Sequence, residues 1–179
     1  MSFVLPEGLP PEVYPLAWLL GSWDGLGVVE YPGVPRATFS QRVTFANDGG
    51  PYLGYSSTLT LLGDDDAPGQ VWSSESGYWR VAPSAPKGVV LDHGKRPLEV
   101  VLADAAGFAS VYLGAIGGGR IDLTSDVVVR TASAPEVAEA SRMYGLVEGD
   151  LLWAWDIAAF GNDLQSYVSA RLSRVRTPD

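Results

Sequence analysis

Alternation of apolar and polar residues is the feature that most constrains the fold of this chain. The stretch "TFSQRVTF" at 38–45 places Phe39, Val43 and Phe45 on one face and polar side chains on the other. The stretch "RIDLTSDVVV" at 120–129 alternates too, and its apolar set is Ile121, Leu123, Val127 and Val129. A period of two residues marks a β-strand with one buried face. We therefore predict an all-β protein.

Clusters of turn-forming residues separate these runs: "NDGG" at 47–50, "GDDDAPG" at 63–69, "GGG" at 117–119 and "EGD" at 148–150. Such residues adopt the positive φ angles that hairpins require. The segment 133–147 is ambiguous because Pro135-Glu136 could open a helix, and we interpret it as mostly strand. We expect about ten antiparallel strands in a barrel without free edges, similar to lipocalins and fatty-acid-binding proteins. A short helical turn, limited by Pro15, precedes them.

Composition and charge exclude several classes of protein. The 179 residues fit one domain spanning 1–179. A net charge of −9 argues against partners such as nucleic acid or acidic membrane surfaces, and the lack of cysteine excludes disulfides, thiol catalysis and thiolate metal sites. The N-terminus does not resemble a signal peptide, and no apolar run approaches the roughly 20 residues that span a bilayer. We expect a cytoplasmic protein.

The stretch "LLGSWDGLGVVEYP" contains the motif Gly21-x-Trp23-x-Gly25-x-Gly27. A tryptophan that enters the first strand can plug one end of a small barrel, and glycines permit sharp bending or close approach of strands. The spacing differs from the dinucleotide-binding fingerprint, which lies between a strand and a helix.

Taken with this motif, the stretches "SESGYWRV", "GFASVYLG", "RMYGLVEGDLLWAWDIAAFG" and "LQSYVSARLSRV" resemble the nitrobindin family. The resemblance covers nearly the whole chain in family order. It implies a ten-stranded barrel, similar to fatty-acid-binding proteins, with a ferric heme docked at one open end. It also implies nitric oxide binding and, in members with heme, conversion of peroxynitrite to nitrate.

Two departures from the family pattern concern the heme site. In heme-binding members the final strand carries the histidine that ligates the iron, and the matching residue here is Tyr167. The family reads similarly to "P-T-G" where this chain has Ala105-Ala106-Gly107. Ordinary heme b binding is therefore not expected, and no other cofactor is implied. The alternatives that keep an iron use Tyr167, water or His93.

The candidate pocket is built around Tyr167. By strand alternation this residue shares a face with Gln165, Ser169 and Arg171. The other pocket candidates are Glu75, which lies in a family-like strand, and Ala106 and Gly107.

Nothing in the sequence predicts a catalytic residue or a metal site. Asp92-His93 lacks an identifiable serine partner, and one histidine cannot supply a zinc site. Two functions from different classes stay open. The first is a binding protein for a small apolar ligand that has lost ordinary heme ligation. The second is a heme-dependent peroxynitrite isomerase. A homodimer formed through a barrel face is a further expectation.

Overall fold

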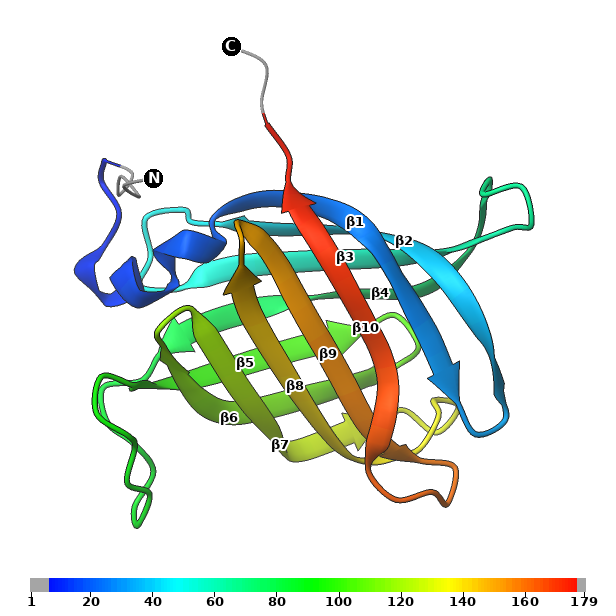
Figure 1. The fold of residues 1–179 in the computed structure, drawn as a ribbon. Coiled ribbons are helices and arrows are strands. Elements are labelled where there is room, and N and C mark those ends of the chain that lie inside the picture. Colours follow the sequence, from blue (N-terminus) through cyan, green and yellow to red (C-terminus); the bar gives the residue numbers. More distant parts are fainter. Residues whose placement is uncertain (1–6, 177–179) are drawn as a thin grey trace.

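The computed structural model describes residues 7–176, which contain one closed antiparallel barrel of ten strands (Figure 1). The strands are Gly21–Tyr31 (β1), Val34–Ala46 (β2), Leu53–Leu62 (β3), Pro68–Val81 (β4), Arg96–Asp104 (β5), Phe108–Gly117 (β6), Arg120–Arg130 (β7), Val137–Val147 (β8), Asp150–Ala159 (β9) and Gln165–Arg174 (β10). Each strand pairs with the next along the chain, and β1 closes the barrel against β10. The predicted fold class is confirmed, including the strand at 137–147.

A 3-10 helix, η1 (Pro11–Leu19), covers one end of the barrel, which we call the closed end. Val13, Leu16 and Leu19 are fully buried, and η1 packs against β4 and β6. Pro15 lies inside this helix and does not end it. Tertiary burial supplies most of the stability of short helices, so one missing N–H donor is tolerated here.

Trp23 fills the closed end beneath η1. It has no exposed surface, and its indole N–H donates a 2.8 Å hydrogen bond to the Leu19 carbonyl. The Arg174 guanidinium lies 4.1 Å from the centroid of the Trp23 ring. The first strand, the last strand and η1 are thus joined at one aromatic side chain.

Gly25 and Gly27 let β1 approach β10 closely. A Cβ on Gly25 would lie 2.1 Å from the Arg171 carbonyl oxygen, and a Cβ on Gly27 would lie 2.5 Å from the Ser169 carbonyl oxygen. These glycines take inward-facing positions, so any larger residue would push the two strands apart.

The opposite end, which we call the open end, carries the irregularities of the barrel. The pairing registers shift near Tyr31, Leu62, Asp126, Ala138 and Tyr167. In addition, β7 and β8 pair only from Arg120–Gly145 to Thr124–Ser141 and separate beyond that point. Bulges are common at barrel rims, where they redirect side chains.

One predicted face is wrong because of such a bulge. Ile121 and Leu123 are buried as expected, but Val127 and Val129 are 44% and 57% exposed. Asp126 is an extra residue between Ser125, which faces Tyr112, and Val127, which faces Val111. An extra residue moves every later side chain to the other face of the strand.

Candidate functional site

A cavity of about 280 Å³ opens at the open end of the barrel. Five aromatic side chains make up much of its wall: Trp72, Phe108, Trp155, Phe160 and Tyr167. The remaining described lining residues are Val34, Gln70, Ser73, Asp104, Ala106, Pro135, Val137 and Ile157. Its volume is just below the roughly 300–1,000 Å³ typical of small-molecule pockets, so it suits a small ligand.

Tyr167 enters this cavity because it is the extra residue of a β-bulge. Ser166 faces Asp156 across the β9–β10 ladder and Val168 faces Trp155, which leaves Tyr167 without a partner. Tyr167 and Val168 are therefore both directed inward, although they are consecutive. The predicted face shared with Ser169 and Arg171 is wrong, since both of these residues are exposed.

Trp72 holds the hydroxyl of Tyr167. The Trp72 indole N–H donates a 2.7 Å hydrogen bond to the Tyr167 oxygen. Trp72 is itself a bulge residue, because Ser73 faces Leu59 and Val71 faces Thr60. The Tyr167 ring also makes edge-on contacts with Tyr31 and Trp155, at centroid distances of 5.8 and 5.1 Å. The tyrosine is thus fixed from several sides.

The surroundings of Tyr167 favour its neutral form. Burial raises the pKa of the Tyr167 hydroxyl, the Trp72 hydrogen bond opposes this, and the negative Asp104 raises the pKa further. Arg171, the cation proposed to lie on the same face, instead pairs with Asp150 at 2.6 Å on the outside of the barrel. No positive side chain is among the described residues that line the cavity.

Asp104 is the one charged residue among the described lining residues. One carboxylate oxygen accepts a 2.9 Å hydrogen bond from the Ser73 hydroxyl, and the other accepts a 2.7 Å bond from the Ala106 N–H. Burial raises the pKa of Asp104, while these two hydrogen bonds act against the rise. The carboxylate is therefore held in place by two donors but remains partly desolvated.

Beneath the cavity lies a buried ion pair. Arg142 donates two hydrogen bonds to the Glu75 carboxylate, at 2.6 and 2.7 Å, and both side chains are almost fully buried. Glu75 also accepts a bond from the Tyr55 hydroxyl at 2.8 Å. The Arg142 guanidinium lies 4.2 Å from the centroid of the Trp155 ring. The pair is also next to the cavity-lining carboxylate, because Glu75 faces Asp104 across the β4–β5 ladder.

Sequence reasoning missed Trp72, Asp104 and Arg142. Arg142 alternates with Ala140 and Tyr144 on a strand face that is buried. An arginine on an apolar face indicates a buried partner, because an isolated charge is too costly to bury. That signal was present in the sequence. The roles of Trp72 and Asp104 depend on pairing across the barrel, which no local pattern reveals.

The other pocket candidates are divided among four places. Ala106 lines the cavity, while Glu75 lies below it in the ion pair. Gly107 forms the β5–β6 turn with φ +97°, and its N–H bonds to the Asp104 carbonyl at 2.9 Å. Gln165 and Ser169 are exposed and do not line the cavity.

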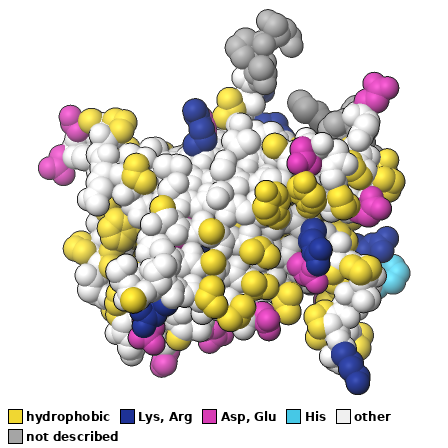
Figure 2. All heavy atoms as spheres, turned by 180° about the vertical axis from the view of Figure 1, so that it is seen from behind, with side chains coloured by type: hydrophobic (Ala, Val, Ile, Leu, Met, Phe, Trp, Pro, Cys, Tyr) yellow, Lys and Arg dark blue, Asp and Glu magenta, His cyan; other side chains and the backbone are white. Residues whose placement is uncertain are grey.

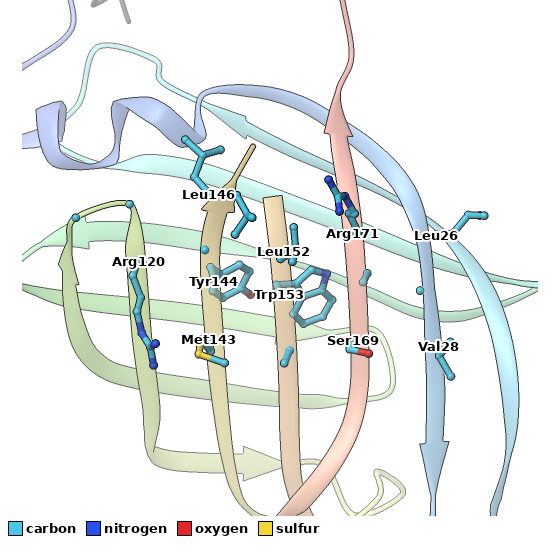
Figure 3. Close-up of a pocket in the computed structure, with 17 residues that line it drawn as sticks. Leu26, Val28, Arg120, Met143, Tyr144, Leu146, Leu152, Trp153, Ser169 and Arg171 are labelled. Atoms are coloured by element: carbon cyan, nitrogen blue, oxygen red, sulfur yellow. The ribbon is translucent and has the colours of Figure 1, made fainter. Parts of the chain in front are cut away.

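Ser169 instead borders a depression of about 760 Å³ on the outer surface of β1, β8, β9 and β10. Figure 3 shows Leu26, Met143 and Leu146 around it. Its two charged lining residues, Arg120 and Arg171, are paired with Asp122 and Asp150. Despite its size, this depression offers no unpaired charge, and it lies outside the barrel.

His93 lies in the segment between β4 and β5 and is exposed, as the cyan side chain in Figure 2 shows. This connection belongs to the end of the barrel covered by η1, whereas Tyr167 is at the open end. The two residues cannot serve one site.

Among residues 7–176 there is no group of three or more His, Cys, Asp or Glu side chains placed to hold a metal ion. Within the same range, no helix combines the length and apolar character needed to cross a membrane.

A closed barrel with one end plugged and an aromatic cavity at the other has the architecture of small ligand-binding β-barrels. The model of the "THAP4-like, heme-binding beta-barrel domain" family matches residues 12–174. The chain belongs to this family, and the predicted resemblance to nitrobindins is confirmed.

Similar proteins include some with each of two names. A "ferric nitrobindin-like protein" of Beutenbergia cavernae is 45% identical, with 98% of this chain and all of the relative covered. A "peroxynitrite isomerase" of Leifsonia xyli subsp. xyli is 41% identical over 95% of this chain and 98% of the relative. The crystal structure of Rv2717c from M. tuberculosis superimposes with a TM-score of 0.77 at 30% identity, covering 94% of this chain and 99% of that one.

Proposed function

We propose that this protein binds a small, largely apolar molecule in the cavity at the open end and does not hold heme through a protein ligand. The observation that carries the proposal is the state of the Tyr167 hydroxyl. It accepts a hydrogen bond from Trp72, and its pKa is raised by burial and by the nearby Asp104. Ligation of ferric iron by tyrosine requires the phenolate. The residues at the opening therefore do not fit a heme held by this side chain.

The side chains of the cavity wall also support the proposal that a small molecule binds there. Trp155 is 3% exposed and lines the cavity, and its indole N–H has no hydrogen-bond partner among the described residues. A buried donor without a partner costs about 1–3 kcal/mol. Because this N–H is not accessible to solvent, a ligand could satisfy it only after Trp155 moves. Aromatic walls with a few fixed polar groups are typical of small-molecule sites.

A titration with hemin tests the first half of the proposal. The wild-type protein is expected to give no saturable Soret band. Tyr167→His should give one, because it restores an imidazole at the position that matches the family's ligand. Tyr167→Phe serves as the control, since it keeps the ring and removes the oxygen. A saturable wild-type band that Tyr167→Phe removes would overturn the proposal.

Binding of small probes tests the second half. We expect 2-phenylethanol or phenethylamine to bind with measurable heat in isothermal titration calorimetry. In ¹⁵N-resolved NMR spectra, the shifts should be concentrated at the amides of Trp72, Asp104, Trp155 and Tyr167. If neither probe binds, or if the shifts fall on the outer depression, the open end is not a ligand site.

A heme-dependent peroxynitrite isomerase is the second candidate, and the names of relatives such as the Leifsonia protein favour it. Bound heme would supply the iron at which peroxynitrite is converted. Because His93 lies at the opposite end, Tyr167 or water would have to complete the iron coordination in this chain. Nitrate yield from peroxynitrite, measured with and without added hemin, tests this candidate. A hemin-dependent rise in nitrate that exceeds the rise given by free hemin would favour it.

Three further expectations stay predictions. They are the single domain over 1–179, the cytoplasmic location and the homodimer. Limited proteolysis, cell fractionation and sedimentation equilibrium test them in turn.

A further inference from the structure

We propose that the cavity selects small organic cations, in which a protonated amine is attached to a flat apolar body. This inference rests on the proposed function, because it assigns a chemical class to the ligand of the same cavity. It combines two observations on the structure of the cavity. They are the carboxylate of Asp104, which has no cationic partner in the described lining, and the aromatic side chains that line the same cavity.

Asp104 can accept a cation without giving up its present bonds. Each of its oxygens accepts one hydrogen bond, from Ser73 and from Ala106, and a carboxylate oxygen can accept more than one. The other charges nearby are already used, because Arg142 and Glu75 form a two-bond pair below Trp155. An amine in the cavity would therefore meet one negative charge that has no cationic partner among the described lining residues.

The aromatic wall complements the same charge. The faces of Trp, Tyr and Phe rings are negative, and a cation within about 6 Å of a ring centroid is attracted to them. This barrel already uses that interaction, because the Arg142 guanidinium lies 4.2 Å from the Trp155 centroid on the interior side. Trp72, Phe108, Phe160 and Tyr167 offer further rings around the cavity. A flat apolar body can pack against these rings while its amine reaches Asp104.

Anionic ligands are disfavoured by the same arrangement. A carboxylate such as that of a fatty acid would meet Asp104 with no cationic side chain in the described lining to compensate. Arg142, the one buried arginine among the described residues, is neutralised by Glu75. Like charges brought together in a partly desolvated site repel each other strongly. The cavity should therefore rank ligands as cation, then neutral molecule, then anion.

Three probes of nearly equal shape test this order by isothermal titration calorimetry at pH 7. They are phenethylamine, which is cationic, 2-phenylethanol, which is neutral, and 3-phenylpropionate, which is anionic. We expect phenethylamine to bind at least about tenfold more tightly than 2-phenylethanol, and 3-phenylpropionate to bind most weakly. Equal affinities for the amine and the alcohol would overturn the inference and leave the proposed function intact.

Two matched variants assign the preference to Asp104. Asp104→Asn keeps an acceptor for Ser73 or Ala106 and removes the charge, so the preference for the amine should disappear while 2-phenylethanol affinity is retained. Asp163→Asn removes one charge from the exposed β9–β10 connection at the same end of the barrel, and it should bind like the wild type. If Asp163→Asn weakens amine binding as much as Asp104→Asn does, the selectivity comes from net charge and the site assignment is wrong. If Asp104→Asn does not fold, the comparison of the three probes on the wild type decides the inference alone.

Discussion

Trp72 and Tyr167 lie 95 residues apart in the chain, and the 2.7 Å hydrogen bond between them joins the bulge of β4 to the bulge of β10. Each bulge turns a side chain inward that regular alternation would have placed elsewhere. The two strands do not pair with each other in the barrel. The bond therefore spans the opening and sets the position of two walls of the cavity.

A double-mutant cycle measures this bond. We expect Trp72→Phe and Tyr167→Phe each to lower the free energy of unfolding by about 1–2 kcal/mol, because each removes one partner of a part-buried hydrogen bond. The double variant should lose less than the sum, with a coupling energy of about 1 kcal/mol in urea denaturation. Strict additivity would mean that the bond contributes nothing to stability.

The fold could be predicted from the sequence, because alternation and turn residues are local signals that act along each strand. The closed-end residue Trp23 and the buried face of Phe39, Val43 and Phe45 follow from them. The position of a bulge does not, because an extra residue is accommodated by the partner strand and by burial. The faces assigned around Tyr167 and around Val127 were wrong for this one reason.

The candidate site was predicted only in part. Tyr167 was found by its match to a family position, and Ala106 by its departure from the family pattern. Asp104 and Trp72 could not be identified from the sequence, because they come together only where the ends of β4, β5 and β10 meet at the open end of the barrel. The cation-binding role proposed for Asp104 depends on the lack of a cationic side chain in the described lining, and that is a property of three-dimensional packing.

The Glu75–Arg142 pair provides a second prediction. Arg142→Met leaves the Glu75 charge buried without its partner, so we expect a loss of about 3–5 kcal/mol in the free energy of unfolding. Adding Glu75→Gln should recover part of this loss, since the double variant buries no unpaired charge. Urea denaturation followed by circular dichroism measures both variants.

An exposed ion pair serves as the control for that experiment. Arg36 and Glu30 form a 2.9 Å ion pair in which both side chains are largely exposed. Because water screens such pairs, Arg36→Met should cost less than about 1 kcal/mol. A loss for Arg142→Met no larger than the loss for Arg36→Met would show that the buried charge is compensated in another way.

The close contact of β1 and β10 predicts unequal effects of alanine at two glycines. Gly25→Ala would place a methyl group 2.1 Å from the Arg171 carbonyl oxygen, and overpacking of this kind costs about 1–3 kcal/mol or more. Gly145→Ala meets no atom within 4 Å, so it should be neutral or slightly stabilising. Thermal unfolding of the two variants under the same conditions compares them, and a similar midpoint would contradict the close approach.

Alkaline pH should destabilise the barrel through its buried tyrosines. Burial raises the pKa of Tyr144 to about 12, with Arg142 acting to lower it and Glu75 to raise it. The unfolded chain loses this proton near pH 10, whereas the folded protein keeps it to about pH 12. Between these values the folded state binds more protons, so stability is fully present below pH 10 and falls as the pH rises. The contribution of Tyr144 is on the order of 2–3 kcal/mol, since one pKa unit corresponds to about 1.4 kcal/mol.

Tyr144→Phe isolates this contribution, because phenylalanine keeps the ring that stacks on Trp153 at a centroid distance of 5.6 Å. The free energy of unfolding of the variant should decline less between pH 10 and 12 than that of the wild type. The free energy of unfolding of the variant, relative to that of the wild type, should therefore rise between pH 10 and pH 12. Parallel curves would mean that Tyr144 ionises at its ordinary pKa in the folded barrel. The remaining decrease in the free energy of unfolding of the variant with pH is then due to other groups. One of them is Tyr55, because burial and Glu75 raise its pKa well above the usual value.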